Sequence, residues 1–225
     1  WSQSDGNLRW VAAPPLLSLV DAGLVRDELE FCKANGACGV FMRGMECERM
    51  VTDRFFHPLY KMAEELDLAI CFHAGNNSFA NFASYPRDAA MMHFKFPVMG
   101  AFCNLLMKRV PQRFPGLRWA FIEVSAQWVP FILNEVKHRF LKEGKRAAGS
   151  LLPDNNFYVT TQKSDDLRWL LNELGDDNLI VGTDYGHNDS ATDIDALRRL
   201  AQDGDLAPGV VDKILAANPS RLYAL

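Results

Sequence analysis

Five apolar residues lead directly into a histidine in the stretch Leu68-Ala69-Ile70-Cys71-Phe72-His73. Because side chains alternate along a strand, Ala69 and Cys71 share a face with His73, and the larger apolar residues point to the opposite face. A parallel α/β protein keeps its chemistry at the carboxyl ends of its strands. The stretch therefore predicts a buried parallel strand that delivers His73 to a functional site.

A second apolar run, at 178–183, delivers Asp184 into a polar segment that also contains His187. A carboxylate in this place can bind a divalent cation and accept a proton from metal-bound water, the two tasks of metal-assisted hydrolysis. The alternative for Asp184 is a turn or helix-capping role, and the alternative for His73 is a structural histidine at a strand end. His187 either contacts substrate or orients Asp184.

Strands and helices alternate along the chain. The predicted strands are 8–13, 37–42, 68–72, 117–124, 156–161 and 178–183. The predicted helices are 21–34, 53–66, 88–110, 127–143, 164–174, 192–202 and 208–217. Asp21 is the expected N-cap of the first helix, and Pro97 is expected to kink or divide the third. The segment 76–87 lacks periodicity, which predicts a loop over the site.

Consecutive strand-helix-strand units imply parallel pairing through right-handed crossovers. Such units build either an open doubly wound sheet or a barrel. No glycine-rich phosphate-binding turn follows any predicted strand, which argues against the nucleotide-binding versions of the open sheet. The order of elements therefore favours an α/β barrel.

The composition suits one globular domain: 225 residues, 48% hydrophobic and 23% charged. The net charge of -4 gives no electrostatic basis for binding nucleic acid or an anionic membrane, so we expect a small-molecule substrate. No apolar stretch approaches the roughly 20 residues that span a bilayer, and a cytoplasmic location is the default expectation. The five cysteines have no CxxC spacing, which makes a cysteine zinc site or disulfide framework unexpected. A homo-oligomer is possible.

Several short motifs occur in the order found in the amidohydrolase superfamily. They are Phe56-His57-Pro58-Leu59-Tyr60 leading to Phe72-His73-Ala74-Gly75; Arg113-Phe114-Pro115-Gly116-Leu117-Arg118; Gly182-Thr183-Asp184-Tyr185 with His187; and Asn218-Pro219-Ser220-Arg221-Leu222-Tyr223. Over nearly its whole length the chain resembles this superfamily, particularly the branch with aminocarboxymuconate-semialdehyde decarboxylase and the resorcylate-type decarboxylases.

This resemblance implies a (β/α)8 TIM barrel with a bound divalent metal, zinc or manganese. Family members hold the metal with a His-x-His pair on the first strand, a histidine on the fifth and an aspartate on the eighth. The resemblance maps His73 to the fifth-strand metal ligand, and Asp184 to the eighth-strand metal ligand and proton acceptor.

The chain has no His-x-His pair, and its six predicted strands correspond to strands three to eight of the family's barrel. We therefore expect residues 1–225 to form one incomplete barrel domain. Since a complete barrel takes about 250 residues, we expect about 100 further residues upstream.

Two more polar residues are candidates for the site. Glu123 stands where the family's sixth strand usually has a histidine. It can ligate a metal or transfer a proton, and it can equally be a buried structural acceptor. Arg43 follows the strand predicted at 37–42 and can clamp a substrate carboxylate by a bidentate pair, with a surface ion pair as its alternative.

The function predicted from these residues is a metal-dependent hydrolase acting on a small carboxylate-bearing or cyclic substrate. Non-oxidative decarboxylation uses nearly the same site and is the first alternative, which Arg43 supports weakly. The missing His-x-His pair and Glu123 also leave open a metal-free barrel fragment that binds a small ligand or another chain.

Overall fold

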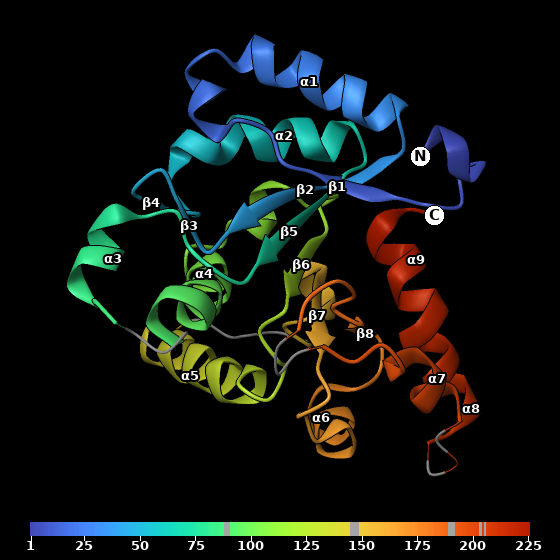
Figure 1. Ribbon diagram of the computed structural model, residues 1–225. Helices are drawn as coiled ribbons and strands as arrows, with labels where there is room; N and C mark the ends of the chain where they lie inside the picture. Colours follow the sequence, from blue (N-terminus) through green and yellow to red (C-terminus); the bar gives the residue numbers. More distant parts are fainter. Residues whose placement is uncertain (88–90, 145–148, 189–191, 203, 205) are drawn as a thin grey trace.

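The structure is a computed structural model that describes residues 1–87, 91–144, 149–188, 192–202, 204 and 206–225. Its main sheet has six parallel strands in the order β1-β2-β5-β6-β7-β8 (Figure 1). Their bounds are β1 Trp10–Ala12, β2 Ala37–Arg43, β5 Ala69–His73, β6 Trp119–Ile122, β7 Phe157–Thr161 and β8 Leu179–Val181. A short antiparallel pair, β3 (Met45–Glu46) and β4 (Arg49–Met50), follows β2.

The α-helices are α1 Ala22–Ala34, α2 His57–Glu65, α3 Phe79–Ser84, α4 Phe96–Met107, α5 Val129–Lys142, α6 Leu167–Leu174, α7 Ala196–Ala201, α8 Pro208–Asp212 and α9 Asn218–Tyr223. Asp21 caps α1 as expected, because its side chain accepts a hydrogen bond from the N–H of Gly23. Among the described helices, none has the length and apolar character needed to cross a membrane.

Two predictions about the region after β5 are wrong in detail. The segment 76–87 contains α3, which Ser78 caps by accepting from the N–H of Asn81. The long helix predicted from residue 88 begins outside the described residues; within them, Met91–Lys95 is a π-helical turn and α4 follows it. Pro97 lies in the first turn of α4, where proline is tolerated, so the helical region is divided beside Pro97 as expected, with the π-helical turn on one side and α4 on the other.

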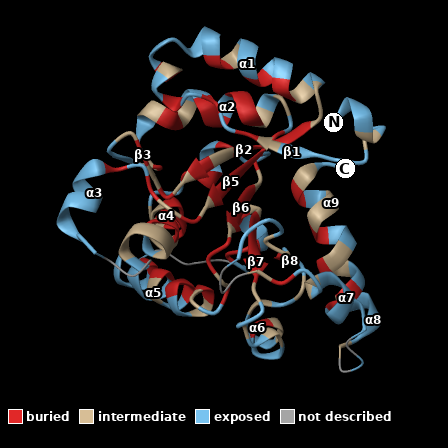
Figure 2. Cartoon of the chain, in the orientation of Figure 1, coloured by how far each residue is buried: buried red, intermediate tan, exposed pale blue. Residues whose placement is uncertain are grey.

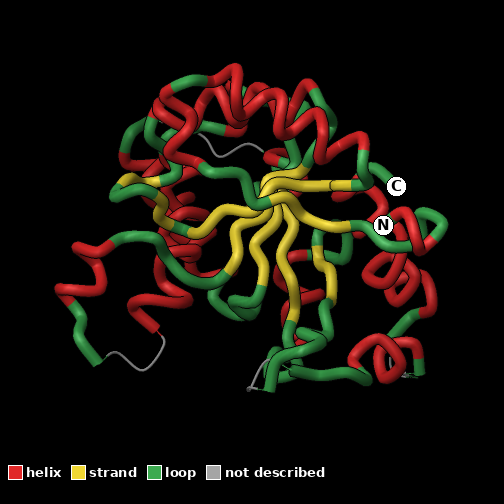
Figure 3. The backbone as a smooth tube through the Cα atoms, turned by 45° about the horizontal axis from the view of Figure 1, so that its top comes forward, coloured by secondary structure: helices red, strands yellow, loops and turns green. Residues whose placement is uncertain are grey.

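Strand order in the main sheet follows chain order. Each new strand is therefore added on the same side, and right-handed crossovers place the connecting helices on one face of a sheet that curves. In Figure 3 the strands gather at the centre with helices around them. This arrangement confirms the predicted α/β class and fits an arc of a barrel, whereas a doubly wound sheet reverses its strand order at a switch point.

The bulky side chains of the strands face the helices. Phe121 of β6 contacts Phe72 of β5 and Phe157 of β7, with ring centroids 5.5 and 5.0 Å apart, and Phe102 of α4 lies 4.9 Å from it. These rings are fully buried. The sheet, together with the helix surfaces that pack on it, is the most buried part of the molecule (Figure 2). This layer supplies the main hydrophobic stabilisation of the fold.

In β5 the smaller side chains occupy the opposite, inner face of the sheet, as the alternation predicts, and they belong to a second buried cluster. This cluster consists of Ala69, Cys71, Ala120, Tyr158, Ile180 and Leu222. Leu222 comes from α9, so the last helix covers part of the inner face and contributes to its packing.

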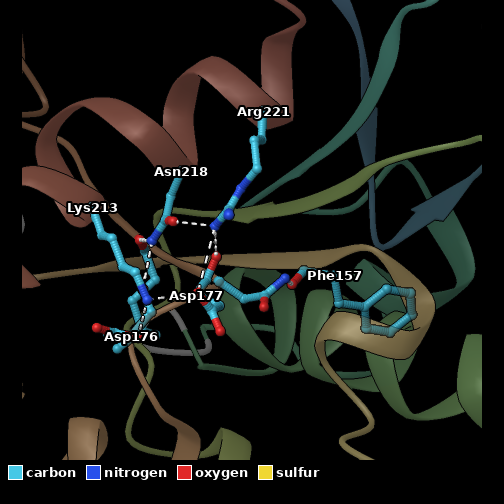
Figure 4. A network of polar contacts seen from close by, with 8 residues as sticks. Phe157, Asp176, Asp177, Lys213, Asn218 and Arg221 are labelled. Atoms are coloured by element: carbon cyan, nitrogen blue, oxygen red, sulfur yellow. Dashed lines mark hydrogen bonds and ion pairs between the residues drawn. The ribbon is translucent and has the colours of Figure 1, made fainter.

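A polar network ties the end of the chain to the turn before β8 (Figure 4). Asn218 is fully buried, and its Nδ2 donates to the carbonyl of Asp176 at 2.7 Å. Lys213 pairs with Asp176 and Asp177, at 2.8 Å each, and Arg221 donates to the carbonyl of Asp177 at 2.7 Å. The terminal motif Asn218 to Arg221 therefore anchors the last helices to the sheet.

Replacing Phe121 by alanine should lower the free energy of unfolding by about 3–5 kcal/mol, because it opens a cavity among three aromatic rings. Phe131 on α5 is the matched control, since it is 68% exposed whereas Phe121 is 0% exposed. Phe131→Ala should change stability by less than about 0.5 kcal/mol. Urea denaturation of both variants measures the difference, and equal effects would contradict this description of the core.

Candidate functional site

His73 is the last residue of β5 and lies on the inner side of the sheet, above Cys71 and Ala69. Its Nδ1 is 3.0 Å from the carbonyl oxygen of Ala74, and its Nε2 is 2.8 Å from Oε2 of Glu123. The contact with Glu123 raises the pKa of His73 above its ordinary value, although burial acts in the opposite direction. The structure thus places the predicted histidine next to the predicted glutamate.

Glu123 follows β6 and is buried, with only 7% of its surface exposed. Its φ of 63° lies in the left-handed region, which a non-glycine residue adopts at an energetic cost. This backbone turn interrupts the alternation of the strand, so Glu123 and the preceding Ile122 line the same cavity. Apart from its contact with His73, Oε2 of Glu123 is buried without a hydrogen-bond partner.

Asp184 follows β8 and also has a left-handed backbone, with φ 50°. Its Oδ1 lies 2.8 Å from Nδ1 of His187, and its Oδ2 accepts a hydrogen bond from the hydroxyl of Thr192 at 3.2 Å. Asp184 is mostly buried, whereas the side chain of His187 is 58% exposed. The pair therefore links the inside of the site to solvent.

His73, Glu123 and Asp184 meet in one small cavity of about 70 Å³, which we call the site cavity. Its other lining residues are Ile122, Thr160, Thr161, Gln162 and Gly182. One potential ligand atom each from Glu123, Asp184 and His187 lies within 4.8 Å of the others, a spacing that could hold a metal ion. His73 is outside this group of three, and its Nε2 faces Glu123.

Arg43 lies beside the site cavity. It is the last residue of β2 and pairs in register with His73, but it lines a separate cavity of about 350 Å³, which we call the side cavity. Its guanidinium is 5.4 Å from the ring centroid of Phe41, in a cation–π arrangement, and Phe41 in turn is 5.4 Å from the ring of His73. Phe41, which lines the side cavity, is therefore in contact both with Arg43 and with His73 of the site cavity.

The sequence analysis missed the contribution of β7 to the site. Thr160 and Gln162 line the site cavity, and the Thr160 hydroxyl is buried without a hydrogen-bond partner. The sequence contains a pattern that points to Thr160 and Gln162. These polar residues follow the apolar start of a predicted strand, as His73 and Asp184 also do.

Asp165 was also missed, and it joins the loops after β6 and β7. Its carboxylate accepts hydrogen bonds from the hydroxyl of Ser125, from the N–H of Ala126 at 3.0 Å and from the N–H of Gln162 at 2.8 Å. Ser125 has a φ of 66°, so this carboxylate stabilises the turn that carries Glu123. No local pattern in the sequence pairs Asp165 with Ser125.

A parallel sheet in chain order with acidic and imidazole groups at its carboxyl edge defines a barrel-type α/β enzyme fold. The family model for amidohydrolases matches residues 3–225, and the chain belongs to this family. Among curated proteins, none matches the sequence significantly.

Solved structures share the fold at low sequence identity. An amidohydrolase from Mycobacterium avium subsp. paratuberculosis K-10 is 19% identical with a TM-score of 0.76, over 96% of this chain and 57% of its own. The 5-carboxyvanillate decarboxylase from Sphingomonas paucimobilis is 18% identical with a TM-score of 0.78, over 100% of this chain and 70% of its own.

A third similar structure is a dihydroxybenzoic acid decarboxylase from Polaromonas sp. JS666, with bound manganese and the inhibitor 2-nitroresorcinol. It is 19% identical with a TM-score of 0.77, over 100% of this chain and 71% of its own. The chain thus spans between 57% and 71% of the length of these three proteins.

The contact between His73 and Glu123 predicts a specific pH dependence of stability. Glu123 raises the pKa of His73, so the folded state binds the imidazole proton more tightly than the unfolded state. The resulting stabilisation is fully present below the unfolded pKa of about 6.5, and it is lost as the pH rises through the higher folded pKa. The free energy of unfolding of the native protein should therefore fall relative to that of the Glu123→Gln variant as the pH rises from 5 to 9.

Urea denaturation of metal-free protein measures this difference. Glu173→Gln, at an exposed position on α6, is the control and should show no comparable pH trend. A difference between native protein and Glu123→Gln that stays constant across the range, or moves the opposite way, would contradict the assigned contact.

Proposed function

We propose that this protein is a metal-dependent, non-oxidative decarboxylase of a small aromatic carboxylate. Family membership and the similar structures support this proposal, because two of these structures are of decarboxylases of aromatic acids. These neighbours favour the decarboxylase alternative over the hydrolase that the sequence first suggested. Hydrolysis stays the second candidate, since the family model itself is described as amidohydrolase.

The observation that carries the proposal is the buried carboxylate of Glu123. An ionised group with one solvent-shielded, under-partnered oxygen is costly unless a cation or proton compensates it. Asp184 and His187 place oxygen and nitrogen atoms within 4.8 Å of the Glu123 carboxylate. This donor set suits zinc or manganese, so the residues present fit a divalent cation.

We assign Glu123, Asp184 and His187 to holding the cation, with His73 orienting Glu123 or joining the ligands. When bound, the cation supplies Lewis-acid stabilisation of negative charge on substrate oxygen atoms. The similar Polaromonas enzyme contains manganese.

The protein groups then have separate tasks in decarboxylation. The bond between the ring carbon and the carboxyl carbon breaks, the electron pair stays on the ring carbon, and that carbon takes up a proton. Asp184 is suited to transfer this proton because it lies in the site cavity while its partner His187 contacts solvent.

Substrate binding involves both cavities. The site cavity, at about 70 Å³, accommodates an ion and a few atoms, since a water molecule takes roughly 30 Å³. The side cavity, at about 350 Å³, is large enough for a small ring, and Arg43 on its wall can pair with a negative group of the substrate. This places the reacting carboxyl near Asp184 and the remainder of the substrate near Arg43.

The direct test is release of carbon dioxide by the purified natural protein from 2,6-dihydroxybenzoate, 5-carboxyvanillate and related aromatic acids. Chelation should abolish release, and added manganese or zinc should restore it. Glu123→Gln and Asp184→Asn should each lower kcat by at least about 100-fold, because the first removes a cation ligand and the second removes a cation ligand that also transfers the proton. Failure of every aromatic acid in the presence of metal, together with cleavage of amides or lactones, would overturn the decarboxylase in favour of the hydrolase.

Asp195→Asn is the matched control for these variants. Asp195 is an exposed carboxylate that pairs with Arg198, and it is absent from the lining of the site cavity. Its replacement should leave kcat unchanged. Equal loss of activity in Asp195→Asn and Asp184→Asn would show that the assay responds to surface charge and not to the site.

A further inference from the structure

Another concave region lies on the helical layer, lined by residues that belong to neither of the two cavities described above. This cavity of about 520 Å³, which we call the outer pocket, is formed by the segment before α2 and the segment after α4. Its lining residues are Thr52, Asp53, Arg54, His57, Lys108, Val110 and Arg113. None of them lines the site cavity or the side cavity.

The outer pocket has an excess of positive charge. Arg54, Lys108 and Arg113 lie on its wall, against the single carboxylate of Asp53. Oδ1 of Asp53 already accepts a hydrogen bond from the N–H of Phe55 at 2.8 Å. Within the described part of the chain, none of the three cations makes an ion pair, whereas other arginines, such as Arg26, do. The outer pocket therefore carries a net positive charge, on three side chains that are exposed to solvent.

The positive charge of the outer pocket affects the pKa of His57. Its ring packs edge-on against Phe114, 5.5 Å between centroids, and its Nε2 is buried without a hydrogen-bond partner. Burial lowers the pKa of His57, and the nearby charges of Arg113 and Arg54 lower it further, against the weaker opposite effect of Asp53. The two arginines, from different segments, are therefore both close enough to act on one imidazole.

We propose that the outer pocket binds the phosphate group of a small molecule. Three cationic side chains on one pocket wall, none of them ion-paired within the described residues, provide the charge-assisted donors that a phosphate dianion requires. The Thr52 hydroxyl, also on the wall, adds a neutral donor. This is a second ligand site, independent of the carboxylate and imidazole cluster at the sheet edge.

The ligand is a small molecule and not a nucleic acid or a membrane. The chain carries a net charge of -4, so a long polyanion approaching the outer pocket meets repulsion from the rest of the surface. The positive region is concave and confined to two short segments. A phosphate on a small molecule reaches it without bringing other negative charges close to the protein.

Isothermal titration with inorganic phosphate, at constant ionic strength maintained with sodium chloride, tests the proposal. The native protein should bind, and a Lys108→Ala and Arg113→Ala double variant should bind at least about 10-fold more weakly, because each loss removes a charge-assisted contact. Lys137→Ala, an exposed lysine on α5, is the matched control and should bind as the native protein does. Equal phosphate affinity in the double variant and the control overturns the proposal.

Two further measurements keep the test decisive if the double variant folds poorly. Arg113→Lys retains the charge and should keep most of the binding. In the native protein, phosphate should raise the pKa of His57 followed by NMR, since an anion offsets the charges of Arg113 and Arg54, which lower this pKa in addition to burial. Binding of phosphate without any change at His57, or binding of succinate as tightly as phosphate, would contradict a phosphate site at this place.

Discussion

Six parallel strands end at one edge of the sheet, and this constraint brings the candidate site together. Right-handed crossovers add each strand beside the previous one, so every strand points the same way. The ends of β5, β6 and β8 therefore place His73, Glu123 and Asp184 in one cavity although they are far apart in the chain. The bulky aromatic layer lies on the other face, against the helices, and its packing sets the positions of these strand ends.

Much of this arrangement follows from local patterns in the sequence. Small and large side chains alternate in β5 because one face meets the helices and the other meets the interior, and that alternation is enough to place His73. The helix α3 was missed because it has only six residues and its first turn depends on a distant group: Glu48 accepts from the hydroxyl of Ser78 and from the N–H of Phe79. The inward direction of Glu123 was not predictable either, since a left-handed turn overrides the alternation of β6. Tertiary contacts decide both features.

The buried cluster on the rest of the inner face consists of unreactive side chains, so the chemistry is confined to the strand ends. Cys71 lies directly below His73 in β5, but burial raises the pKa of its thiol to about 12, so it stays protonated and packs as an apolar residue. Leu222 and Tyr158 belong to the same inner-face cluster as Cys71. The terminal motif that contributes to the family resemblance also serves the fold, because Asn218 and Arg221 tie α9 to the turn before β8. Part of what identifies the family is thus architecture and not chemistry.

The left-handed backbones of Glu123 and Asp184 set function against stability. Glycine adopts this conformation at no steric cost, so a glycine at either position would relieve backbone strain of about 1 kcal/mol per residue. At position 123 it would also remove a carboxylate from an enclosed, poorly solvated place. Selection for thermal stability alone would therefore favour replacing both acids, and a lineage that keeps them would indicate that their chemistry is in use.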